Sequence, residues 1–170
     1  MCYARFGSWS LVFATFAAAI AACPAVSRVT DFTWFAQGHT TLRLYGFFSM
    51  TMFAAIYHIL PQVSGVKICP NRTKAHFWLA MPGALLLALP LLIGGVKQGL
   101  KLANAEVPFL ESTKAAMMMF RLSTIGETLI AIGALLFMAN VLPSIFSHYR
   151  AIAKSAIADA TAIQSSEVKS

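Results

Sequence analysis

Residues 76–96 read HFWLAMPGALLLALPLLIGGV, a run without any aspartate, glutamate, lysine or arginine. A helix needs about 20 predominantly apolar residues to cross the hydrocarbon core of a bilayer. Pro82 and Pro90 lie inside the run, and membrane helices tolerate proline where neighbouring helices satisfy the freed carbonyl groups. The stretch therefore predicts one transmembrane helix that belongs to a packed bundle.

The composition of the whole chain agrees with a membrane protein. Of its 170 residues, 58% are hydrophobic and only 11% are charged, whereas soluble domains carry about 25% charged residues. The net charge is +7, but the basic residues are spread over short connecting segments and the tail instead of forming one patch. This distribution is typical of the loops between membrane spans, so we expect no nucleic-acid partner.

Three further apolar stretches accompany residues 76–96. They cover residues 8–26, residues 44–63 and, after a weak start near Ala115, residues 128–141. The predicted fold class is all-α, a polytopic membrane helix bundle of four transmembrane helices over residues 1–146. A polar, alanine-rich tail, either a frayed helix or disordered, is expected at 147–170.

The basic residues that flank the spans predict the orientation. One side carries Arg5, Lys67, Arg72, Lys74, Arg150 and Lys154, and the other carries Arg28, Lys97, Lys101 and Lys114. The side richer in basic residues faces the cytoplasm, so both termini are expected there. An alternative comes from residues 20–23, IAAC, which look like a lipoprotein cleavage box before Cys23 and would remove the first span.

His39 is the first candidate for a cofactor ligand. It precedes the second apolar stretch within FAQGHTTLRLYGFF, residues 35–48. Neutral imidazole is the commonest protein ligand of haem and metal ions, but a histidine at such a place also bonds to backbone or water. The three cysteines, Cys2, Cys23 and Cys69, form no CxxC pair and have no histidine at zinc spacing. Side-chain chemistry alone leaves both interpretations of His39 open.

Several stretches, in order, resemble the catalytic subunit I of cbb3-type cytochrome c oxidases, in the haem–copper oxidase superfamily. VTDFTWFAQGH at 29–39 and LYGFFSMTMFAAIYHILPQVSG at 44–65 are similar to its tenth-helix region. HFWLAMPGALLLALPLLIGGVKQGL, VPFLEST and GETLIAIGALLFMANVLPSI resemble the next helix, the following loop and the last helix. The resemblance covers residues 3–146 and corresponds to the C-terminal third of the family's subunit.

The resemblance implies a role for His39. In that family the first histidine of an H-x-H motif binds the high-spin haem and the second binds the low-spin haem. His39 matches the first, which implies an axial ligand of the haem iron (b-type haem), whereas Thr41 takes the second place. Arg43, where the family usually has a small residue, either extends its stem to the interface or contacts a haem propionate.

The resemblance also implies a function. The chain would be part of a respiratory terminal oxidase of the electron-transport chain, an oxidoreductase complex in the bacterial inner membrane that takes electrons from a cytochrome c-type donor. The copper-ligand helices of the family lie upstream of this region, so copper is not expected on this chain. It would need the N-terminal part of subunit I and other oxidase subunits, and would be catalytically incomplete alone. The alternatives are a non-catalytic membrane assembly or interaction protein, and a fragment of a nitric oxide reductase-like subunit.

A few other residues carry weaker expectations. Glu127 is either a proton-relay residue or a partner of Arg121. His58 is expected to be buried and hydrogen-bonded, and His76 to lie at the interface, neither of them as a ligand. The methionines at 117–119 are expected to serve packing, and the small residues at Gly95 and Gly99 to permit a helix–helix contact.

Overall fold

The structure, a computed structural model, describes residues 2–65 and 68–167, and the side chains of these except residue 115 and residues 159–167. The described chain is helical. Its elements are α1 (Cys2–Ala21), α2 (Pro24–Thr30), α3 (Trp34–Thr41), the π-helix η1 (Leu42–Ser49), α4 (Met50–Ser64), α5 (Pro70–Leu102) and α6 (Phe109–Glu167). Four helical stretches are long and apolar enough to cross a membrane: Cys2–Ala21, Trp34–Ser64, Pro70–Leu102 and Phe109–Ala158. The predicted fold class is confirmed, and the chain is a multi-pass membrane protein.

The second span begins earlier than the apolar run predicts. Thr33 caps α3, because its hydroxyl accepts a hydrogen bond from the Phe35 N–H at 3.3 Å. The helix then continues without interruption through η1 and α4 to Ser64. The predicted start at residue 44 was wrong because polar residues hide the first turns from a hydropathy criterion. His39 and Arg43 therefore lie within one continuous helix that begins at Trp34.

The π-helix η1 joins α3 to α4. Such i→i+5 segments are rare and are frequent at functional sites. Gly46 lets η1 approach α1, since a Cβ there would lie 3.0 Å from Ser10 Oγ. Ser49 Oγ donates to the carbonyl of Leu44, five residues earlier, at 3.0 Å. The segment changes the helical phase, so α4 presents different faces from those that an unbroken α-helix would present.

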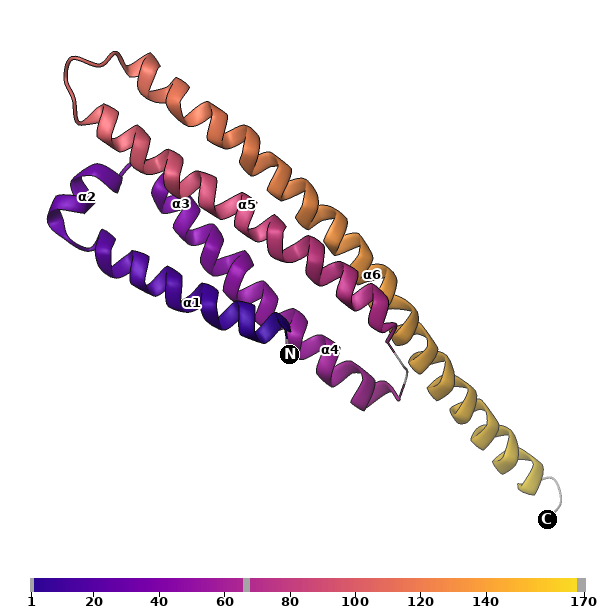
Figure 1. Cartoon of the computed structure of the whole chain (residues 1–170). Helices are drawn as coiled ribbons and strands as arrows, with labels where there is room; N and C mark the ends of the chain where they lie inside the picture. The colour runs from indigo at the N-terminus through magenta and orange to yellow at the C-terminus, as the bar shows by residue number, and fades with distance from the viewer. Residues whose placement is uncertain (1, 66–67, 168–170) are drawn as a thin grey trace.

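Helix α5 lies at the centre of the bundle, between α6 and the α3–α4 helix (Figure 1), and it is the most buried span. Small residues bring its backbone close to its neighbours. A Cβ at Gly95 would lie 2.1 Å from Phe35 N of α3, and one at Gly99 would lie 1.8 Å from Val29 O of α2. The expected helix contact at these glycines is confirmed, and the partners are α3 and α2 of the same chain.

Helix α6 is much longer than a span. It runs for 59 residues from Phe109 to Glu167, about 88 Å at 1.5 Å per residue. Its C-terminal part extends past the end of the bundle (Figure 1). The polar tail expected from residue 147 thus continues α6 as helix over the described residues.

A buried asparagine on α6 closes the end of the bundle where α4 turns into α5. Asn140 Nδ2 donates to Thr73 Oγ1 at 3.0 Å, and Asn140 Oδ1 accepts from the Cys69 N–H at 3.3 Å. Gly65, with φ of 65°, ends α4 in the left-handed conformation that glycine adopts easily. The amide of Asn140 therefore satisfies backbone and side-chain groups at the start of α5.

Candidate functional site

His39 lies half-buried on α3 and faces α1. Its Nε2 is 2.9 Å from the carbonyl oxygen of Ala14. A carbonyl oxygen only accepts, so Nε2 carries the proton and donates it to this bond. The preceding Gly38 packs α3 tightly on α5, because a Cβ there would lie 2.7 Å from Leu92 N. The position of His39 between α1 and α5 is thus fixed by close backbone contacts.

His39 has the chemistry of a haem ligand, but its Nε2 is engaged in a hydrogen bond in the observed conformation. Iron ligation requires a ring nitrogen with a free lone pair. In the observed side-chain conformation Nε2 has its proton directed at Ala14 O. The free lone pair of this tautomer is on Nδ1, and ligation through Nε2 would require His39 to give up the bond to Ala14 O and turn its ring. The haem-ligand role of His39 therefore stays a prediction.

The described residues offer no second candidate ligand beside His39. Thr41, at the second motif position, is 5% exposed and buried in the bundle. Within the part of the chain that the structure describes, no group of three or more histidine, cysteine or acidic residues could hold a metal ion. The prediction for this region thus depends on a single imidazole.

Arg43 lies on the outward face of η1. It lines a hollow of about 360 Å³ together with Thr40, Leu44, Phe47 and Phe48. Among the described residues no hydrogen bond or ion pair reaches its guanidinium. An arginine at the centre of a span costs about 2.5–3.5 kcal/mol on insertion scales. His39 is not among the residues that line this hollow, and contact of Arg43 with a haem propionate stays a prediction.

A buried polar cluster that no sequence motif predicts lies between three helices. His76 is 1% exposed, and its Nδ1 is 2.9 Å from Tyr3 Oη and 3.1 Å from Tyr57 Oη. Tyr3 Oη also donates to the carbonyl of Thr73 at 2.9 Å. Because Tyr3 Oη gives its single proton to Thr73 O, a neutral imidazole protonated at Nδ1 donates to Tyr3 Oη, and Tyr57 Oη lies beside the same N–H. The residues come from α1, α4 and α5, so the cluster joins three helices.

Aromatic rings surround this cluster. The ring centroid of His76 is 4.5 Å from that of Phe53 and 5.5 Å from that of Phe137 of α6. Tyr3 and Phe77 contact edge to face at 4.9 Å. No spacing in the sequence connects these residues. The one available signal is that each polar ring stands in an otherwise apolar stretch.

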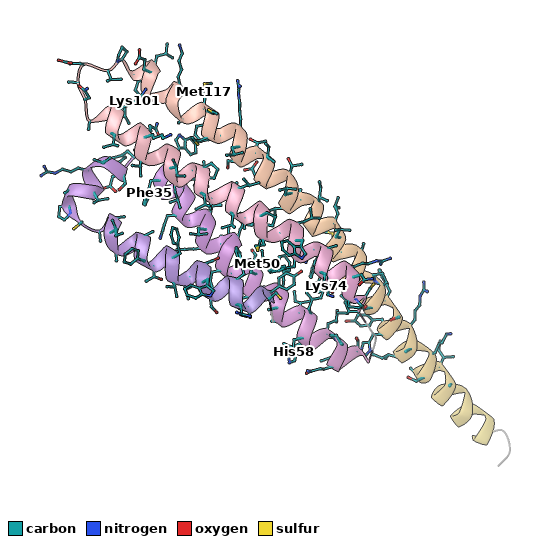
Figure 2. All side chains as sticks on the ribbon, viewed as in Figure 1. Phe35, Met50, His58, Lys74, Lys101 and Met117 are labelled. Carbon is teal, nitrogen blue, oxygen red and sulfur yellow. The ribbon has the colours of Figure 1, made fainter. Side chains whose placement is uncertain are left out.

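The structure encloses His76 in the bundle and leaves His58 on its surface, so the expected burial of His58 was wrong. His76 was expected at the interface and is fully buried, whereas His58 was expected inside and is exposed. Figure 2 shows the His58 side chain pointing away from the bundle, and its Nε2 lies 3.3 Å from Gln62 Nε2 on the same helix. The phase change at η1 explains His58, and the helical start of α5 at Pro70 explains His76.

Glu127 is exposed on α6, directly after Gly126. Gly126 packs tightly on α5, because a Cβ there would lie 2.4 Å from Leu87 N. No ion pair joins Glu127 to Arg121 in the described chain. The proton-relay role of Glu127 stays a prediction.

These features define the class of the protein: a multi-pass bundle of membrane helices with one candidate ligand histidine inside its second span. Residues 1–129 match the family described as Cytochrome C and Quinol oxidase polypeptide I. The match covers more than half of the chain, and the chain belongs to this family of haem–copper oxidase subunits, whose members bind haems and copper.

Curated relatives agree with this membership. The chain is 27% identical to a cytochrome c oxidase subunit 1 homolog of Agrobacterium tumefaciens (strain T37), over 81% of this chain and 27% of the relative. It is 29% identical to the Cbb3-type cytochrome c oxidase subunit CcoN1 of Stutzerimonas stutzeri, over 93% of this chain and 35% of that protein. The chain thus matches only about a third or less of the length of these relatives.

A solved structure shows the same fold. It is a chain of a heme-copper terminal oxidase dimer, with a TM-score of 0.66 and 21% sequence identity, and the similarity covers 84% of this chain and 26% of the other. The resemblance seen in the sequence is confirmed at the level of the family, with a cbb3-type subunit among its distant relatives.

Proposed function

We propose that this chain works as part of a membrane-bound respiratory terminal oxidase and corresponds to the last four helices of a cbb3-type subunit I. The observation that carries the proposal is the family match over residues 1–129, within which the second span holds His39. The chain alone is catalytically incomplete. It would act with the N-terminal part of subunit I and other oxidase subunits, in a complex that passes electrons from a cytochrome c-type donor to oxygen. Copper would bind outside this chain.

His39 is the residue that we assign to the haem. As axial ligand of a high-spin b-type haem it would exchange its hydrogen bond with Ala14 O for a bond to iron. The haem, when bound, would supply the electron-transfer and oxygen-binding chemistry. The task of the chain is positioning: Gly38 keeps α3 against α5, so the imidazole stays at a fixed depth. Arg43 is the candidate contact for a propionate.

We also propose that the chain lies in a bacterial inner membrane with both termini in the cytoplasm. The support is the excess of basic residues on the side that holds both termini. An even number of spans, as in the structure, is consistent with termini on one side.

A second candidate function is supported by a specific observation. The bond between His39 Nε2 and Ala14 O, together with Thr41 at the second motif position, suits a bundle that has kept the fold without the haems. Such a chain would be a non-catalytic assembly or interaction protein of the membrane. In this case His39 would serve only to join α3 to α1.

A reduced-minus-oxidised absorption spectrum separates the two functions. The chain is purified from bacterial membranes, alone and co-expressed with the N-terminal part of a cbb3-type subunit I. The oxidase role predicts a haem band in the co-expressed complex, and this band should be weaker in His39→Ala. His58→Ala is the matched control, because His58 is an exposed histidine of the same span, and it should leave the band unchanged. A band that His39→Ala leaves intact contradicts the ligand role, and a co-expressed complex without any band favours the non-catalytic function.

A further inference from the structure

An apolar groove lies between α4 and α6, near the end of the bundle where α4 turns into α5. It has a volume of about 670 Å³, and each of the described residues that line it is hydrophobic. Phe137 of α6 lines the groove and reaches α4, because its ring centroid lies 4.9 Å from that of Phe53. Ile59 of α4 and Leu142 of α6 also line it and are 53% and 46% exposed. The described spans therefore leave the groove open.

The walls of the groove have the form of helix-packing surfaces. The lining residues of α4, between positions 52 and 63, and those of α6, between positions 137 and 145, repeat four apart in two neighbouring rows on each helix. Rows of this spacing are the ridges that interdigitate when helices pack. The α4 wall extends over about three turns, or roughly 17 Å. Ala55 has the smallest side chain among the described lining residues, and small residues let a neighbouring membrane helix approach closely.

The two spans that form the walls bury little of their surface within this chain. In the apolar stretch that marks each span, 11% of the second span and 22% of α6 are buried, against 56% of α5. The chain corresponds to only 27% and 35% of the length of two curated relatives. Under the proposed function, the rest of subunit I is the partner that can cover these apolar surfaces.

We propose that the groove between α4 and α6 receives one transmembrane helix from the N-terminal part of subunit I. The inference rests on the proposed oxidase function and adds the place of contact and the chemistry of the partner. The face that enters the groove must lack charged residues, because no lining side chain could pair with them and a charge in the membrane is costly. A bulky apolar side chain of that helix would lie opposite Ala55. Neither His39 nor Arg43 lines the groove, so the helix would not compete with a haem for these residues.

Site-specific photocrosslinking identifies the occupant. Ile59 or Leu142 is replaced, one at a time, by the photoreactive residue benzoylphenylalanine in a chain that is co-expressed in bacterial membranes with the N-terminal part of a cbb3-type subunit I. Both positions should crosslink to one and the same transmembrane helix of that part, as read by mass spectrometry. Ile132, an exposed residue of α6 that does not line the groove, should not give this product. Products that contain only phospholipid, or only a second copy of this chain, overturn the proposal.

A plugged groove provides the second test. Ala55→Phe adds bulk inside the groove, so the amount of N-terminal part that co-purifies with the chain should fall about fivefold or more. His58→Phe is the matched control, since its side chain lies on the same helix and points away from the bundle (Figure 2), and it should leave the amount unchanged. If Ala55→Phe fails to insert, the smaller change Ala55→Val should give a weaker loss in the same direction.

The outcomes separate this inference from the function on which it rests. If the N-terminal part does not co-purify with the unaltered chain, the oxidase function and the docking site fail together. If it co-purifies equally with the unaltered chain and with Ala55→Phe, or if His58→Phe causes an equal loss, the docking site alone is overturned.

Discussion

At the scale of single residues, the environment of each histidine depends on helical phase. His58 stands in an apolar stretch and His76 at the start of another, and spans that are apolar on every face show no clear periodicity. Their burial is settled by details that hydropathy does not contain: the start of α5 at Pro70 and the π-helix η1 before α4. The sequence could name these histidines as polar exceptions, but not which of them is enclosed.

Replacing His76 should destabilise the bundle. His76→Ala removes a side chain that is 1% exposed and takes away the imidazole that bonds to the hydroxyls of Tyr3 and Tyr57. The cavity and the lost hydrogen bonds together should lower the free energy of unfolding by about 3 kcal/mol. Unfolding in detergent, followed by circular dichroism against increasing SDS, measures the change.

The matched control for this experiment is His58→Ala, since His58 is exposed. It should change the free energy of unfolding by less than about 0.5 kcal/mol. Equal effects of the two variants would contradict the enclosed cluster.

Cys69 should be a more reactive thiol than its exposure alone suggests. Main-chain N–H groups of Arg72 and Asn71, at the start of α5, stabilise the thiolate and lower the pKa of Cys69. Because the thiolate is the reactive form, alkylation should accelerate at a lower pH in the folded protein than in the denatured one. In a background with Cys2→Ser and Cys23→Ser, the pH dependence of labelling by a water-soluble maleimide measures this shift. Coincident pH profiles for folded and denatured protein would exclude it.

At the scale of the elements, hydropathy finds the spans but not their ends. The four apolar runs gave the number of spans because lipid requires about 20 apolar residues in each. The starts of α3 and α5 were missed because capping and helix-start residues such as Thr33 and Pro70 are polar or helix-breaking in other contexts. The π-helix over Leu42–Ser49 had no signal in the sequence.

The glycines of α5 provide a test at this scale. A Cβ added by Gly99→Ala would lie 1.8 Å from the carbonyl oxygen of Val29, so α2 and α5 must separate. Alanine favours a helix by about 1 kcal/mol over glycine, but overpacking against backbone costs about 1–3 kcal/mol or more. We expect a net loss of stability and a lower midpoint of thermal unfolding in detergent.

Gly133→Ala is the control for this substitution. A Cβ at Gly133 would meet its nearest atom, on His76, at 3.4 Å, which is ordinary contact. The helix preference of alanine should then dominate, and the midpoint should stay the same or rise. A fall as large as that of Gly99→Ala would contradict the close approach of α2 to α5.

At the scale of the whole molecule, α5 organises the bundle. It holds α6 on one side and α3 on the other (Figure 1), so each of the outer helices has a large exposed apolar surface. This arrangement and the length of the relatives both suit a unit that works beside other membrane helices. The family could be recognised from the order of its stretches, whereas the direction of the His39 ring and the enclosure of His76 needed coordinates.

The length of α6 has a mechanical consequence. A bilayer with its headgroups is about 45 Å thick, and the 59 residues of α6 form a rod about 88 Å long. Nearly half of this rod must therefore stand clear of the lipid. A small tilt of the bundle would move the far end of α6 by a larger distance than it moves the spans themselves. A probe attached at that end would therefore report small rearrangements of the spans.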